Sequence, residues 1–498
     1  MPDAKGQAAS RPGPDLLSGS VPKAMALFAI PTLGSSVLQS LNGSINAIWV
    51  GRFLGEEALA ATTNGNIVMF LLISFVFGFG MASTIFIGQA AGRSDEDGAR
   101  RVMGTALGTI IPMGAAIALI GWFVAPWLLG VLGTPGEARA LALTYLRVIF
   151  VAMPATLTFT LVMMALRGTG DSITPLKFMG VSAALDVALN PVLILGLGPV
   201  PELGIFGSGL ATVIANTVAL VGIMVSLYRR DSVLALRGRA LRLLLPDRTV
   251  LRAVVGKGLP IGLQMIVIST ASLTMLTLIN REGVDTAAAY GATQQLWTYV
   301  QMPAMALSAA ASAMAAQNIG AGQWGRVGRI ARWGIYFNLG LTGLLIALLT
   351  VFDRAALGLF LGADSTAIPI GRHIQLVATW GYLFFGIAQV LFGTMRANGY
   401  VIAPLIVMVI SMYPVRLGFA FGLRPVLGED ALWLSFPIGM TATAAMAAWL
   451  YRRGRWREGS AVSRNEAAKG TGADRDCGSV NGTGTDLAPG ATVSRHAA

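Results

Sequence analysis

Long apolar runs alternate with short charged or Gly/Pro-rich breaks along most of the chain. A helix that crosses a hydrocarbon core about 30 Å thick needs about 20 apolar residues, and twelve runs reach that length. The first six runs cover residues 24–50, 58–87, 102–130, 139–166, 175–197 and 204–228. The second six cover residues 250–279, 286–316, 329–352, 368–395, 403–423 and 430–451. The pattern predicts an all-α polytopic membrane protein with twelve transmembrane helices.

The composition supports this fold class and narrows the partners. The chain has 498 residues, of which 54% are hydrophobic and 12% charged, whereas soluble domains carry about 25% charged residues. The net charge of +12 would suit nucleic acid only on a wetted basic face, and here the basic residues lie between apolar runs. We therefore expect membrane lipid and small organic molecules as partners, and no nucleic acid.

The charges between the runs predict the orientation in the membrane. Loops after even-numbered runs are basic, as at Arg93, Arg229 and Arg326, while loops after odd-numbered runs are acidic, as at Glu56 and Glu137. Cytoplasmic loops carry the excess of Lys and Arg. Both termini are therefore expected in the cytoplasm, with the protein in the plasma (inner) membrane.

The two halves of the chain repeat each other. At an offset of 228 residues Gln89 and Gly92 fall on Gln317 and Gly320, and at 229 "RGTGDSITPLKFM" falls on "RANGYVIAPLIVM". Because each half has six helices, both halves begin on the same side of the membrane. This predicts two lobes related by a pseudo-two-fold axis along the membrane normal, as in several secondary transporters.

The same patterns divide the chain into five parts. They are a disordered cytoplasmic N-terminus (1–23), the N-lobe with helices 1–6 (24–229), a cytoplasmic linker (230–249), the C-lobe with helices 7–12 (250–452) and a disordered cytoplasmic tail (453–498). The tail is rich in Gly, Ser, Thr and Ala, a composition that cannot bury enough apolar surface to fold.

One carboxylate lies deep in an apolar run. Asp186 follows Pro175 by eleven residues, or about 17 Å along a helix, which places it near the middle of the bilayer. An acid there costs about 2.5–3.5 kcal/mol to insert, so such residues are rare and usually functional. The alternatives are a site for a coupling ion and a structural ion pair with Arg416, which the repeat places one residue from the Asp186 position. Arg416 can equally reach toward the outer headgroups.

Several motifs, in this order and spacing, resemble the multidrug and toxic-compound extrusion (MATE) family of prokaryotic efflux transporters. They are "VGRFLGEEALAA" (50–61), "GQAAG" (88–92), "ALRGTGDSITP" (165–175), "NPVLILGLG" (190–198), "LGIFGSGLATV" (203–213), "GLPIGLQ" (258–264) and "AQNIGAG" (316–322). The resemblance implies antiport by alternating access, with export of amphipathic, cationic organic compounds driven by entry of protons or sodium ions. The alternative within the superfamily is a lipid-linked oligosaccharide flippase, many of which have fourteen helices and a strongly basic cavity.

The resemblance also implies a cation-coupling site in the N-lobe. Relatives commonly carry an Asp five residues before the glycine of "VG", where this chain has Asn46, and they show Asn before Asp on helix 5, whereas here Asp186 precedes Asn190. Residues four apart share a helix face, so both still point to one site. The further polar positions of that site are Gln39, Tyr145 and Thr212. A single acid suits one proton, because burial disfavours the charged form of a carboxyl group; sodium is the alternative.

Polar residues in the C-lobe are candidates for lining the substrate cavity. Amides in a membrane need partners or water, so we assign Gln264, Gln294 and Gln295 to the cavity, although interhelical hydrogen bonds explain each as well. Met265 is a further candidate, since methionines adapt to varied ligands. Pro31 and Pro260 are candidate hinges, and a static kink is the alternative for each.

The sequence argues against catalysis and metal binding. The chain has one cysteine, Cys477, and two histidines, His373 and His496, so neither a disulfide framework nor a Cys/His metal site is available. A membrane-embedded enzyme needs a nucleophile, base or metal constellation. We therefore expect a transporter without a cofactor, apart from the coupling ion, that functions as a monomer.

Overall fold

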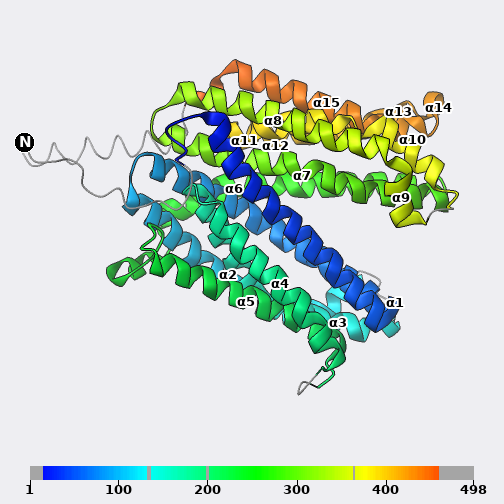
Figure 1. Ribbon diagram of the computed structural model, residues 1–498, viewed down its shortest axis with the longest axis horizontal. Coiled ribbons are helices and arrows are strands. Elements are labelled where there is room, and N and C mark those ends of the chain that lie inside the picture. The colour runs from blue at the N-terminus through cyan, green and yellow to red at the C-terminus, as the bar shows by residue number, and fades with distance from the viewer. Residues whose placement is uncertain (1–14, 132–135, 198–200, 363–364, 459–498) are drawn as a thin grey trace, which may run out of the picture. The chain divides into compact units, whose positions relative to one another are not determined.

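The computed structural model describes residues 15–131, 136–197, 201–362 and 365–458. Every regular element in this part of the chain is a helix. Figure 1 shows the helices running side by side along the long axis, which is the arrangement expected of membrane-crossing segments.

The N-lobe is made of the first five labelled helices. They are α1 (Val21–Gly92), α2 (Glu96–Val131), α3 (Gly136–Gly168), α4 (Ile173–Leu195) and α5 (Gly204–Arg229). The backbone leaves the helical conformation inside α1 at Gly55, where φ is +85°, a value that glycine adopts without a steric penalty. This break divides α1 into two spans, Val21–Gly55 and Leu72–Gly92.

A linker and the helices of the C-lobe follow. The linker contains η1 (Gly238–Leu244), and Asp247 caps α6 (Arg248–Ile279) by accepting from the Thr249 backbone N–H at 2.8 Å. The remaining elements are α7 (Val284–Gly320), α8 (Trp324–Val351), α9 (Asp353–Leu361), α10 (Ile368–Ala378), α11 (Gly381–Arg396), α12 (Ile402–Ile410), η2 (Ser411–Leu417), α13 (Gly418–Gly422), α14 (Arg424–Leu427), α15 (Asp430–Arg453) and η3 (Arg455–Arg457).

The described helices account for the twelve predicted spans. Ten are long and apolar enough to cross a membrane, and α10 with α11, bent by 47°, makes an eleventh. The twelfth is α7, which has 37 residues but a lower hydropathy because polar residues such as Gln294, Gln295 and Gln301 interrupt it. The predicted fold class, twelve helices in two lobes, is confirmed. An even number of spans also agrees with α1 beginning and α15 ending at the same end of the molecule (Figure 1).

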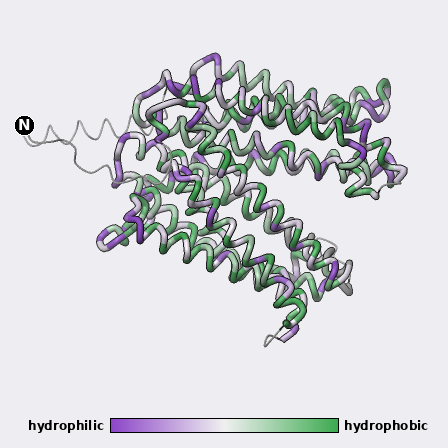
Figure 2. Tube along the Cα trace, viewed as in Figure 1, coloured by the Kyte–Doolittle hydropathy of each residue, from purple (hydrophilic) through white to green (hydrophobic). Residues whose placement is uncertain are grey.

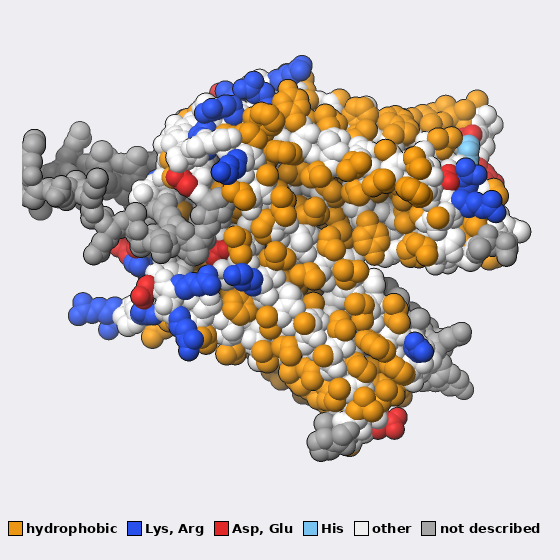
Figure 3. Space-filling model, in the orientation of Figure 1, with side chains coloured by type: hydrophobic (Ala, Val, Ile, Leu, Met, Phe, Trp, Pro, Cys, Tyr) orange, Lys and Arg blue, Asp and Glu red, His pale blue; other side chains and the backbone are white. Residues whose placement is uncertain are grey.

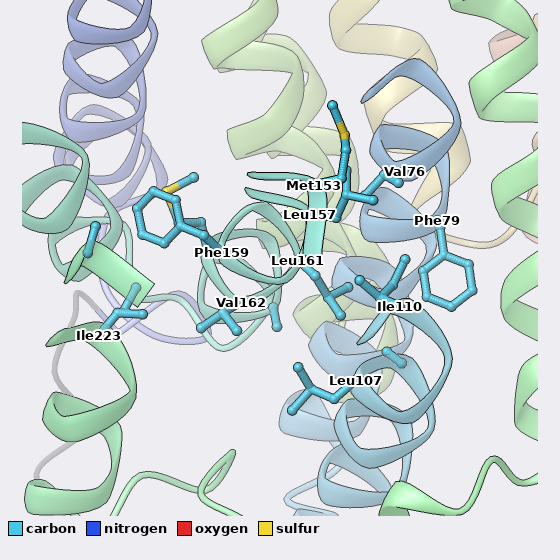
Figure 4. Packing of buried hydrophobic residues seen from close by; sticks show 14 of the residues in the cluster. Val76, Phe79, Leu107, Ile110, Met153, Leu157, Phe159, Leu161, Val162 and Ile223 are labelled. Carbon is cyan, nitrogen blue, oxygen red and sulfur yellow. The ribbon is translucent and has the colours of Figure 1, made fainter. Parts of the chain in front are cut away.

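Apolar side chains fill the lobes and also cover their outer faces. The N-lobe core includes Val76, Leu107, Met153 and Phe159, which pack between α1, α2 and α3 in Figure 4. Hydrophobic residues also form a broad band over the surface in Figure 3, while purple hydrophilic residues in Figure 2 gather at the helix ends. Lipid tails are as apolar as leucine, so this band suits a membrane-embedded surface.

Two glutamines link the lobes in a symmetrical way. The Gln89 side chain donates to the backbone carbonyl of Ala397 at 2.7 Å, and the Gln317 side chain donates to that of Gly168 at 2.9 Å. Glutamine and acceptor exchange places under the repeat, at offsets of 228 and 229. The backbones also touch, since a Cβ atom built on Gly92 would lie 2.0 Å from the Gln317 carbonyl oxygen. One on Gly320 would lie 2.1 Å from that of Gln89.

The segment before α1 departs from the sequence prediction. Residues 1–14 lie outside the described part, but from Asp15 onward the predicted disordered N-terminus is wrong, because this segment packs against the C-lobe. Leu16 is 2% exposed and its carbonyl accepts from Asn318 at 3.0 Å. Arg326 donates to the carbonyls of Ser18 and Gly19, both at 2.8 Å. A buried leucine and satisfied backbone groups hold the segment in place.

The start of the predicted C-terminal tail is also packed. Residues 459–498 lie outside the described part, whereas Trp456 is buried and its carbonyl accepts from Asn398 at 2.6 Å. Its ring stacks on Tyr451 with centroids 5.0 Å apart. The tail as predicted, beginning at residue 453, therefore starts several residues too early.

The close interlobe contact predicts that Gly92→Ala destabilises the protein. The added methyl group has no room against the Gln317 backbone, and overpacking of this kind costs about 1–3 kcal/mol. We expect a clear decrease in the melting temperature of the detergent-purified protein, followed by intrinsic fluorescence. Gly328→Ala is the matched control, because a Cβ atom there meets nothing within 4 Å. Equal melting temperatures for the two variants would contradict the assignment of Gly92 as a contact glycine.

Candidate functional site

The Asp186 carboxylate is buried among the helices of the N-lobe. It lies near the middle of α4, is 2% exposed, and α4 packs against both α5 and the first part of α1. The run from Ile173 to Leu195 is helical and apolar on most of its surface, so the backbone uses its own hydrogen bonds and leaves the carboxylate to find side-chain partners.

Three helices supply these partners. Asn42 of α1 donates to the Oδ2 atom of Asp186 at 2.8 Å, and Thr212 of α5 donates to Oδ1 at 3.1 Å. Asn190, one turn further along α4, donates to the Asp186 backbone carbonyl at 2.9 Å and to Oδ1 at 3.3 Å. The carboxylate thus receives neutral hydrogen-bond donors, and none of the ion pairs in the described part of the chain includes it.

The site also holds two oxygen atoms without a partner. The amide oxygens of Asn42 and Asn190 are buried and accept no hydrogen bond from a described residue. Buried polar atoms are normally satisfied. The site can therefore accept a proton donor or a small cation.

The other residues assigned to the coupling site lie at different distances from the carboxylate. Tyr145 of α3 is buried and interacts electrostatically with Asp186, but forms no hydrogen bond with it. Asn46 accepts from Ser208 of α5 at 3.0 Å. Gln39 is exposed and makes no hydrogen bond with a described residue. The structure therefore brings Asn190 and Thr212 to Asp186, places Tyr145 nearby, and leaves Asn46 and Gln39 outside the first contacts.

Sequence reasoning missed Asn42, the residue with the shortest hydrogen bond to Asp186. The signal was present, because Gln39, Asn42 and Asn46 are spaced three and four residues apart and so lie on one helix face. The resemblance pointed to the Asn46 position instead, and a single turn of helix separates the two asparagines.

Arg416 does not pair with Asp186. It lies in η2, a π-helical turn of the C-lobe, where it is 5% exposed and its guanidinium stands 3.8 Å from the ring centre of Phe436. The ion pair with Asp186 is therefore wrong for this structure, and so is the alternative of a side chain reaching to the headgroups. The repeat placed the two residues at equivalent positions in different lobes, which does not bring them into contact.

The residues assigned to the substrate cavity lie on α6 and α7. Gln264 is buried and its Nε2 atom has no partner among the described residues, while Met265 is half-buried. Gln294 is exposed and Gln295 half-buried. The helices continue through both candidate hinges, Pro31 in α1 and Pro260 in α6. The roles of these six residues stay predictions.

Twelve spans in two repeated lobes, with a buried carboxylate inside one lobe, define a secondary transporter. The family model MatE matches residues 31–192 and again residues 260–421, so both ends of the second match lie 229 residues after those of the first. The chain therefore belongs to the MATE family, whose members are transporters and not enzymes.

Individual relatives agree with this family. The chain is 36% identical to the probable multidrug resistance protein YoeA of Bacillus subtilis (strain 168) over 435 residues, covering 87% of this chain and 94% of that protein. It is 23% identical to the multidrug export protein MepA of Staphylococcus aureus (strain MSSA476), over 76% of this chain and 82% of that protein. Two crystal structures are similar in fold. The MATE P26A mutant has a TM-score of 0.81, 22% identity and coverage of 88% of this chain and 97% of that chain. MATE in the bent conformation has a TM-score of 0.80, 23% identity and coverage of 92% and 98%.

The geometry predicts that Asn42 matters more to the site than Asn46. Removing a hydrogen bond to a charged group costs about 1.5–3 kcal/mol, or about 10- to 150-fold in an equilibrium constant. We expect Asn42→Ala to reduce ion-coupled transport in proteoliposomes at least about tenfold. Asn46→Ala, the matched variant one turn away on the same helix, should remain within about threefold of the wild type. A larger loss in Asn46→Ala would show that the hydrogen bond to Asp186 is not what sets the importance of these residues.

Proposed function

We propose that the protein is an antiporter that exports amphipathic organic compounds, cations among them, in exchange for protons that bind to Asp186. The observation that carries this proposal is the buried carboxylate with neutral donors and no paired cation in the described chain. A charge in that position is costly, so binding of a proton changes the energy of the site strongly. The multidrug names of the relatives support the substrate class.

The hydrogen bonds suggest how a proton would act on the fold. An ionised carboxylate only accepts hydrogen bonds, whereas a protonated one also donates. A proton on Oδ2 opposes the Asn42 N–H group that now points to that atom. Asn42 must then turn its unpaired amide oxygen toward Asp186 or move away. Because α1 also packs on α7 of the C-lobe, a change at Asn42 reaches the interface between the lobes.

One proton supplies enough energy for useful export. A potential of 100 mV gives about 2.3 kcal/mol per charge and one pH unit about 1.4 kcal/mol. Together they support a gradient of several hundredfold for a neutral compound. For a monovalent cation the electrical contributions cancel, which leaves about tenfold.

Sodium is the second candidate for the coupling ion. The observation that favours it is the pair of unpartnered amide oxygens of Asn42 and Asn190 beside the carboxylate. Hard cations prefer such oxygen ligands. Transport driven by a pH gradient in sodium-free buffer, compared with transport driven by a sodium gradient at equal pH, separates the two ions.

The orientation follows from the charges. Lys and Arg residues gather at the end where α1 begins and α15 ends (Figure 3). We place this end in the cytoplasm, by the excess of positive charge that cytoplasmic loops carry. The protein is then an inner-membrane transporter with both termini inside, acting as a monomer.

The proposal predicts that Asp186→Asn abolishes ion-coupled export. Asparagine keeps the shape of the side chain but cannot bind and release a proton. We expect folded, monodisperse protein whose extrusion of a fluorescent cation from energised vesicles falls to the background of empty vesicles. Glu202→Gln, which neutralises an exposed acid after α4, should retain wild-type rates. Undiminished pH-driven export by Asp186→Asn would refute the coupling role.

A further inference from the structure

The buried arginine of the C-lobe lacks an anionic partner. Arg416 forms no ion pair in the part of the chain that the structure describes, although it lies inside a membrane-spanning helix. Ionisable residues within such helices are rare, usually pair with another group and usually serve a function. The missing partner is therefore a feature that requires an explanation.

Contacts with Phe436 and Met412 leave one edge of the guanidinium free. Phe436 covers its face at 3.8 Å, and the Nη1 atom contacts the sulfur of Met412 at 3.7 Å. A cation–π contact acts on the face of the ring and supplies no acceptor for the N–H groups at the edge. The Nε and Nη2 atoms are buried and have no hydrogen-bond partner among the described residues. These two nitrogens form one edge of the planar group, which binds the two oxygens of a carboxylate in parallel.

Two tyrosines add further donors from neighbouring helices. Tyr290 of α7 and Tyr382 of α11 are buried and interact electrostatically with Arg416. Neither hydroxyl makes a hydrogen bond with a described residue. Phenolic hydroxyls donate readily to anions. The surroundings of Arg416 therefore offer N–H and O–H donors from three elements of the C-lobe and aromatic walls beside them.

The backbone places Arg416 at the position that Asp186 occupies in the N-lobe. Up to residue 408 the halves align at an offset of 229. The π-helical turn Ser411–Leu417 has one more residue per hydrogen-bonded turn than an α-helix, which raises the offset to 230. Arg416 then falls on Asp186. Gly209 and Gly439 are also 230 residues apart, and a Cβ atom on Gly439 would lie 2.9 Å from that of Arg416.

We infer that Arg416, with Tyr290 and Tyr382, forms a binding site for a monovalent anion in the C-lobe. The anion is either the carboxylate of an aromatic organic compound or chloride. The free guanidinium edge fits a carboxylate, and the aromatic side chains fit a ring attached to it. If the anion belongs to an exported compound, which rests on the proposed function, the substrates include aromatic carboxylates and zwitterions as well as cations.

Calorimetric titration of the detergent-purified full chain tests this site without any transport. Benzoate, chloride and the neutral benzamide serve as probes, with sulfate as the background anion. We expect benzoate or chloride to bind and benzamide not to bind. Arg416→Gln should weaken anion binding at least about tenfold, which corresponds to loss of one charge-assisted contact. Tyr382→Phe, which removes only a hydroxyl group, should weaken it about threefold or more and covers the case in which Arg416→Gln fails to fold.

Arg416→Lys distinguishes the two sources of the anion. Lysine keeps the charge but cannot bind an oxyanion in two places, so a carboxylate site loses benzoate affinity while a chloride site keeps chloride affinity. Arg372→Gln, an exposed and paired arginine of the same lobe, should bind as the wild type does. Asp186→Asn should retain anion binding even where export is lost, so a failure of the proposed function does not touch this result. Absence of benzoate and chloride binding in the wild type, or unchanged affinity in folded Arg416→Gln, would overturn the inference.

Discussion

A charged side chain cannot stay unpartnered in hydrocarbon without a large cost, and this constraint governs both lobes. Most of the chain avoids it, because charged residues lie at the helix ends and the apolar band faces lipid. Asp186 and Arg416 are the exceptions that the preceding analysis turns on. Asp186 is held by amide and hydroxyl donors from three helices. Arg416 is held by an aromatic face and keeps one edge free. A charge that the protein stabilises incompletely is one that a ligand can complete.

The repeat explains why these two residues occupy corresponding places. Duplicated lobes share a backbone, so a buried position in one lobe has a buried counterpart in the other, and only the side chains and local helix geometry differ. The N-lobe keeps a regular α-helix around Asp186, while the C-lobe has a π-helical turn around Arg416. At the interface the symmetry is retained instead, with Gln89 and Gln317 exchanging equivalent hydrogen bonds. The lobes thus differ where they bind and agree where they meet.

The sequence predicted the fold well because membrane thickness allows few solutions. Run length gave the twelve helices, and the offset of 229 gave the two lobes. It predicted the site less well, because the register between helices is a tertiary property. Asn42 and Asn46 lie on one face of α1, and only packing against α4 decides that Asn42 reaches Asp186. The segment around Leu16 was missed for a related reason, since its polar composition does not reveal a single buried leucine or the carbonyls that Arg326 binds.

Helix α1 connects the constraint on charge to the relation between the lobes. Its Asn42 contacts the carboxylate of the N-lobe, while Met25 and Phe28, nearer its start, pack in a cluster with Met314 and Ile330 of the C-lobe. The segment before it is bonded to Asn318 and Arg326 of the C-lobe. A helix fixed to one lobe at its start and hydrogen-bonded to the other near its middle must respond when the second bond changes. Neutralising a single carboxylate can therefore act on the whole interface, because the cost of a buried charge and the packing of the lobes are borne by the same helix.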